Sequence, residues 1–193
     1  DQSNCAIAVG AFAAGNKSTS QAQKAIAVGF AAGYDNQKEA SIAIGQQAGY
    51  KDQGDYSIAL GYYAGAVDQS FQSIAIGTGA GQSNQYEESI ALGRQAGYSF
   101  QGKEAVAMGL FAGAKDQSFN SIAIGSQAGQ TMQNNNSIAI GYKAGFKNQK
   151  SHAIAIGHGA AASHVTGKEQ GYQGLAIGNT AGYESQGQQS VAI

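Results

Sequence analysis

Ser41-Ile42-Ala43-Ile44-Gly45 is a five-residue segment that recurs, lightly varied, from one end of the chain to the other. Its closing glycine returns every sixteen residues without exception from Gly29 to Gly157. A fixed short period predicts a solenoid, in which each repeat forms one coil and buries its surface against the next coil. The closing glycines are Gly10, Gly29, Gly45, Gly61, Gly77, Gly93, Gly109, Gly125, Gly141, Gly157 and Gly178.

The segment alternates small and large apolar residues. An alternation with period two predicts a β-strand whose two faces differ. We expect the large residues, such as Ile42 and Ile44, to fill the coil, and the small residues, such as Ser41 and Ala43, to face another chain. This expected inter-chain face comprises Ala27, Ala43, Ala59, Ala75, Ala91, Ala107, Ala123, Ala139 and Ala155.

The second half of each repeat carries its own constant residues. An Ala-Gly pair such as Ala48-Gly49 follows the segment, and a second glycine corner predicts two short strands per coil. A glutamine stands four places after that pair in every repeat, which predicts an amide ladder inside the coil or at its corner. The alternative is a solvated polar column. The residues are Gln21, Gln37, Gln53, Gln69, Gln85, Gln101, Gln117, Gln133, Gln149, Gln170 and Gln186.

The period also defines the domain organisation. We expect residues 1–193 to form a single solenoid of about twelve repeats, with extra residues near 15–20 and 162–169 forming loops. A weaker 48-residue period returns the pattern of 66–71 at 114–119. It indicates either duplication of a three-coil module or a triangular solenoid with 48 residues per turn.

Composition excludes several classes of protein. The chain is 42% hydrophobic with a formal charge of −1, which predicts an ordered chain. Near neutrality gives no electrostatic reason to expect nucleic acid as a partner, and no apolar run is long enough for membrane insertion. No polar capping repeat is present, so we expect either an excerpt of a longer array or a subunit that stacks end to end.

The nine residues Ser137 to Gly145, which read Ser-Ile-Ala-Ile-Gly-Tyr-Lys-Ala-Gly, carry a resemblance that extends over essentially the whole chain. They are similar to the head repeats of YadA-like trimeric autotransporter adhesins, and to repeats in tail and surface fibres of phages and large viruses. The resemblance implies an all-β, left-handed parallel β-roll in a homotrimer, with small strand residues facing the trimer axis. It also implies an extracellular position on a cell or virion. The 16-residue coil and the glutamine column depart from the usual adhesin head.

Residues with catalytic or metal-binding chemistry are sparse. The three histidines lack further ligands at a suitable spacing, and the aspartates that precede ladder glutamines are typical of solvated turns. We therefore expect no cofactor, no metal and no enzymatic activity. The residues considered are His152, His158 and His164 for a metal, Asp52, Asp68 and Asp116 for calcium, and Asn16 and Asn135 as glycosylation sequons.

The sequence thus predicts a structural extracellular fibre or adhesin segment, a rigid rod that displays variable residues for attachment. Tyr62, Tyr63 and Phe111 occupy variable places, where they could bind a host glycan or surface receptor or pack against adjacent chains. One alternative is a self-polymerising filament subunit. Another is an ice-binding or glycan-binding solenoid, although threonine never recurs in register over successive coils.

Overall fold

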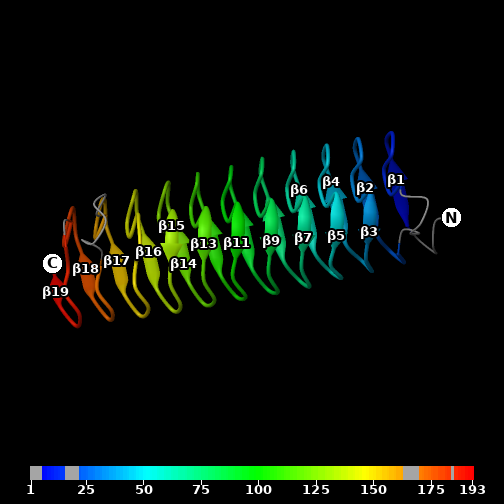
Figure 1. Ribbon diagram of the computed structural model, residues 1–193. Helices are drawn as coiled ribbons and strands as arrows, with labels where there is room; N and C mark the ends of the chain where they lie inside the picture. Colours follow the sequence, from blue (N-terminus) through cyan, green and yellow to red (C-terminus); the bar gives the residue numbers. More distant parts are fainter. Residues whose placement is uncertain (1–5, 16–21, 163–169, 184) are drawn as a thin grey trace.

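The computed structural model describes residues 6–15, 22–162, 170–183 and 185–193. Within these residues the chain forms strands and no helix. The coils stack along one axis into an elongated rod, with the earliest and latest coils at opposite ends (Figure 1). The prediction of an all-β parallel solenoid with 16-residue coils and two short strands per coil is confirmed.

The repeated segment forms one face of the rod, a parallel sheet of 12 strands that we call the long sheet. Each strand pairs in register with its counterpart in the next coil, for example Ile42 with Ile58 and Ala43 with Ala59. The strands are β1 (Ile7–Val9), β2 (Ile26–Val28), β4 (Ile42–Ile44), β6 (Ile58–Leu60), β8 (Ile74–Ile76), β10 (Ile90–Leu92), β12 (Val106–Met108), β14 (Ile122–Ile124), β16 (Ile138–Ile140), β17 (Ile154–Ile156), β18 (Leu175–Ile177) and β19 (Val191–Ala192).

The residues ending in the constant glutamine form a second parallel sheet of 7 strands, which we call the short sheet. In each of its strands the first and third residues pair with the next coil and the middle residue does not. The middle residue has a left-handed backbone conformation, as at Asp52 with a φ of 54°. Bridges between Thr131 and Lys147 and between Gln170 and Gln186 continue the same column. The strands are β3 (Asp35–Gln37), β5 (Lys51–Gln53), β7 (Val67–Gln69), β9 (Ser83–Gln85), β11 (Ser99–Gln101), β13 (Lys115–Gln117) and β15 (Thr131–Gln133).

The strand register decides between the two interpretations of the 48-residue period. Ile74 pairs with Ile90, sixteen residues on, so one turn contains one repeat. The triangular solenoid with 48 residues per turn is therefore wrong. The extra residues leave the long sheet undisturbed, because Ile7 pairs with Ile26 and Ile154 pairs with Leu175. Most residues of the two expected loops lie outside the described residues.

The two faces of the long-sheet strands are the reverse of the sequence prediction. The expected inter-chain alanines have an exposed fraction of 0% within a single chain, so no other chain can contact them. The residues corrected are Ala27, Ala43, Ala59, Ala75, Ala91, Ala107, Ala123, Ala139 and Ala155. Ser41 is also buried, whereas Leu60 is 40% exposed. The small residues line the inside of the coil and the large aliphatic residues face outward.

The narrowness of the coil explains this reversal. A Cβ atom built on Gly49 would lie 3.2 Å from the Cβ atom of Ala43 and 2.7 Å from the amide carbon of Gln53. Backbone and amide therefore already occupy the space in front of Ala43. At the closing glycines the coils are equally close, because a Cβ atom on Gly109 would lie 2.8 Å from the carbonyl of Gly125. These contacts leave no room for a larger side chain at the place of Ala43.

The constant glutamines fill the remaining interior. Gln101 is fully buried, and its Nε2 donates to the carbonyl oxygens of Ile90 at 2.7 Å and Ala105 at 3.1 Å. Each amide thereby links the short sheet to the long sheet of the same coil. Amides also bond one another over parts of the column, as from Gln53 to Gln69 at 3.3 Å. Gln21 lies outside the described residues.

Replacing Gln101 with Ala is expected to lower the free energy of unfolding by about 2–4 kcal/mol. The change leaves a cavity, removes the Gln101 donor from the Ile90 carbonyl oxygen, and leaves the Ala105 carbonyl oxygen accepting from the Ile90 N–H. Urea unfolding followed by circular dichroism measures the loss. Gln46→Ala is the matched control, because Gln46 is exposed. Equal unfolding free energies for the two variants would contradict the structural role of the inner amide.

Candidate interaction surfaces

The outer face of the long sheet is a continuous apolar surface. We call it the aliphatic face, and it consists of the first and third residues of the long-sheet strands from β1 to β18, all of them Ile, Val, Leu or Met. Strict register places each residue directly beside its equivalent in the next coil, as with Leu92 beside Met108. Soluble monomers rarely expose contiguous apolar patches larger than a few hundred Å². A face of this length is therefore a candidate interface with another chain.

The predicted surface aromatics belong to two places along the rod. Tyr62 and Tyr63 contact each other edge to face, with ring centroids 4.5 Å apart. Phe111 occupies the same place in the coil as Tyr63 but lies three coils further on, with the Arg94 guanidinium 5.8 Å from its ring centroid. The structure thus brings the two tyrosines together and places Phe111 in a separate surface.

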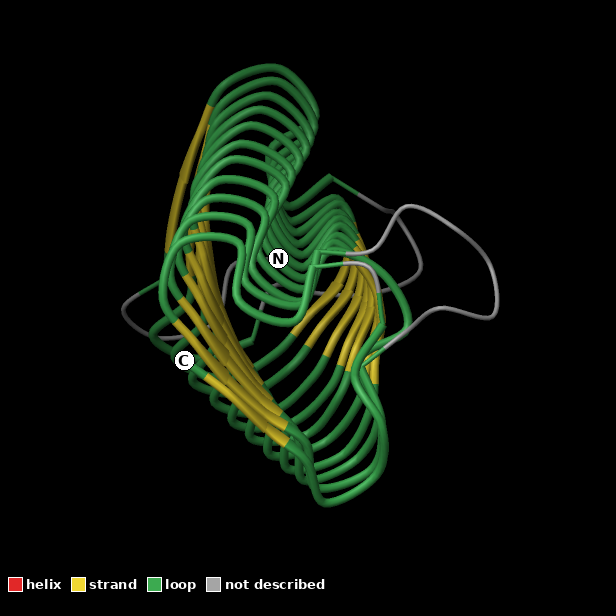
Figure 2. Cartoon of the chain, turned by 90° about the vertical axis from the view of Figure 1, so that its left-hand side faces the viewer, coloured by secondary structure: helices red, strands yellow, loops and turns green. Residues whose placement is uncertain are grey.

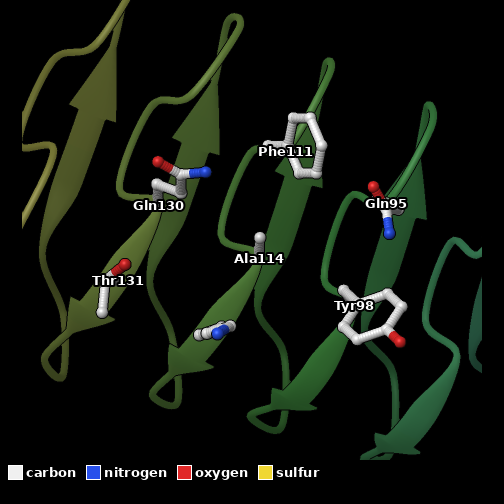
Figure 3. Close-up of a pocket in the computed structure, with 7 residues that line it drawn as sticks. Gln95, Tyr98, Phe111, Ala114, Gln130 and Thr131 are labelled. Atoms are coloured by element: carbon white, nitrogen blue, oxygen red, sulfur yellow. The ribbon is translucent and has the colours of Figure 1, made fainter.

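The backbone of each coil is indented on the side away from the aliphatic face, between the loop after the long sheet and the short sheet (Figure 2). We call this indented side of the rod the groove. The groove contains a hollow of about 390 Å³ next to Phe111 (Figure 3). A second hollow of about 210 Å³ lies near Tyr34 and Tyr50, whose rings stack with centroids 5.2 Å apart.

The first hollow was not predicted as a site, because its residues come from three successive coils at places that vary between repeats. A signal was present in the sequence, since Tyr50 and Tyr98 share one place 48 residues apart. The lining residues are Gln95, Tyr98, Phe111, Ala114, Lys115, Gln130 and Thr131.

The candidate calcium residues do not converge. Asp52 and Asp68 line one hollow of about 430 Å³ on the short-sheet side, whereas Asp116 lines a different one. Asp52 also accepts a hydrogen bond of 2.7 Å from the Asn36 amide. Among the described residues, no group of three or more His, Cys, Asp or Glu side chains has a geometry that could hold a metal ion.

The two described histidines each pack on a different tyrosine. His152 packs edge to face on Tyr172, and His158 stacks on Tyr142. His164 and Asn16 lie outside the described residues, and Asn135 borders a hollow beside the short sheet.

Charges on the rod form small surface groups. The Lys103 ammonium lies 3.3 Å from the Glu87 carboxylate, and both side chains are about half exposed. The hydrogen bond with Glu87 and its charge raise the pKa of Lys103. Exposed ion pairs of this kind contribute little to stability. No helix in the described part of the chain is long and apolar enough to cross a membrane.

Comparison with known families found a match to part of the chain. The family described as YadA head domain repeat matches the chain in two copies, at residues 53–66 and 101–128. Both segments begin at a constant glutamine, which is the last residue of a short-sheet strand, and continue through the next long-sheet strand. The second segment also contains β13 and β14. Comparisons with curated proteins and with solved structures gave no match.

Proposed function

Because the chain carries YadA head domain repeats, we propose that it is a structural segment of an extracellular, adhesin-like fibre. Its role is mechanical and non-catalytic. A rod of stacked coils, each bonded to the next through two parallel sheets, holds variable outer residues away from the surface of a cell or virion.

The observation that carries this proposal is the aliphatic face. Three chains side by side, with their aliphatic faces turned toward a common axis, would cover it along its full length. This arrangement keeps the trimer that the resemblance implies but replaces the small residues at its axis with Ile, Val, Leu and Met. The gain comes from removing apolar surface from water, at roughly 25 cal/mol per Å².

The aliphatic face also favours the trimer over the alternative assemblies. A filament that grows end to end would join strand edges at the rod ends and leave this face in water. An ice-binding surface would need a regular array, whereas Thr78, Thr131 and Thr180 occupy three different places in the coil.

Small-angle X-ray scattering of the 193-residue chain tests the proposal. Strands spaced about 4.8 Å apart over the 12-stranded sheet give a rod roughly 50 Å long. A trimer side by side keeps this length and triples the mass per unit length. A single-chain cross-section, or a length that grows in multiples of the rod, would overturn the side-by-side assembly.

A further inference from the structure

We propose that the groove hollow over Ala114 is a binding subsite for a pyranose unit of an oligosaccharide. The proposal rests on the display role given above, because it identifies what a displayed surface would bind. It differs from that role in its residues, because the hollow is lined by residues of the short-sheet strands and of the loop before them, whereas the aliphatic face belongs to the long sheet.

The hollow lies where a small residue stands between larger residues of the two neighbouring coils, an arrangement that the sequence also has at Ala66, between Tyr50 and Gln82. Ala114 occupies the place held by Tyr98 in the preceding coil and Gln130 in the following coil. Phe111, from the same coil as Ala114, forms a third side (Figure 3). The result is a concave space of about 390 Å³ whose floor is a methyl group.

Two of its walls are aromatic. Tyr98 and Phe111 are partly exposed, and they flank the hollow on adjacent coils. The C–H face of a pyranose ring is apolar and packs on the face of an aromatic ring, which keeps its hydroxyl groups at the periphery. Two aromatic side chains around a methyl floor therefore suit a flat ring with an apolar face.

The remaining lining residues supply polar side chains that are available to hydrogen-bond a ligand. Gln95 and Gln130 carry amides, and Thr131 carries a hydroxyl. Within the described part of the chain, none of these three side chains takes part in a hydrogen bond. An amide both donates and accepts, as a sugar hydroxyl does, so the set matches the periphery of a pyranose. Lys115 is exposed at the rim, where its ammonium could also pair with a sugar carboxylate.

Saturation-transfer NMR with lactose, chitotriose and 3′-sialyllactose tests the site. We expect transfer to at least one probe, with a Kd on the order of 1 mM for a small ligand of this size. Preference for 3′-sialyllactose, weakened by Lys115→Gln, would assign an acidic sugar, and equal binding of lactose would assign a neutral one. Absence of transfer to all three probes would overturn the proposal.

Matched variants locate the binding. Ala114→Gln fills the hollow with the residue that the following coil holds at this place, Gln130, so the coil should fold. We expect this variant and Tyr98→Ala to weaken binding at least tenfold. Tyr86→Ala removes an exposed aromatic outside the groove and should leave binding unchanged. Unchanged binding in Ala114→Gln, or a changed subunit number in either groove variant, would overturn the subsite.

The outcomes separate this inference from the proposed function. A side-by-side trimer that binds none of the sugars would remove the subsite and leave the fibre role intact. A folded single chain that binds sugar and loses it in Ala114→Gln would remove the trimer and leave the subsite.

Discussion

The Ala91→Leu variant is expected to lose the folded coil rather than the association between chains. Ala91 is fully buried on the inner face of β10, and a Cβ atom built on Gly97 would already lie 3.3 Å from its Cβ atom. The amide of Gln101 closes the same space. Three added carbon atoms must therefore push the two sheets apart, at about 3 kcal/mol or more, the upper range for overpacked cores.

Urea unfolding and far-UV circular dichroism measure this effect. Ala11→Leu is the control, because Ala11 is exposed and the change in side-chain size is identical. Ala91→Leu should unfold at a much lower urea concentration, and Ala11→Leu should match the parent chain. A folded Ala91→Leu chain of normal stability that no longer associates would mean that the small residues face another chain after all.

The triple variant Leu60→Glu, Leu92→Glu, Ile124→Glu is expected to dissociate while keeping its β-structure. These three side chains occupy one column of the aliphatic face, 40%, 37% and 36% exposed in the single chain. In a trimer around this face, each substitution brings three carboxylates together near the axis. Burying a charge without a partner costs several kcal/mol, so the nine charges of the trimer should abolish association.

Sedimentation velocity of the parent and variant chains at equal concentration provides the measurement. The triple variant Gln46→Glu, Thr78→Glu, Arg94→Glu is the matched control, because its three sites are exposed in the loop after the long sheet. The control should sediment like the parent chain. If the aliphatic-face variant kept the subunit number of its parent, another surface would have to hold the chains together.

The repeat period accounts for what the sequence could predict. Identical spacing of the closing glycines gives the coil length, and the alternation in Ile42-Ala43-Ile44 gives the strand. The place of Gln53 four residues after a corner glycine is also periodic, so its column could be anticipated. All of these follow from one-dimensional regularity, because each coil repeats the conformation of the one before it.

Alternation cannot say which face of a strand is inside. The general preference for burying large apolar residues predicts that Ile42 and Ile44 point into the coil. The coil is too narrow for them, so Ala43 points inward and the two isoleucines point outward. The deciding features are Gly49 and the Gln53 amide, which already fill the space beside Ala43. A constant glycine and a constant glutamine are signs of such a narrow interior, and in the described part of the chain no Phe or Tyr is buried.

The groove subsite could not be predicted from the sequence, because its residues come together only in the folded coil. Tyr98, Ala114 and Gln130 are sixteen residues apart in the chain, and only the coil-to-coil register makes them neighbours. Among the predicted aromatics, Phe111 lies in this hollow, while Tyr62 and Tyr63 pack on each other. Variation between repeats, which made these places look like ordinary surface, is what creates a local hollow in an otherwise regular rod.

Sedimentation equilibrium of the 193-residue chain tests most directly whether the aliphatic face is an interface between chains. The chain has a mass of 19.6 kDa, and the trimer around this face predicts a particle of three times that mass, with intact β circular dichroism. A folded particle of 19.6 kDa at micromolar concentration would contradict the account, because the aliphatic face would then be stable in water without a cover.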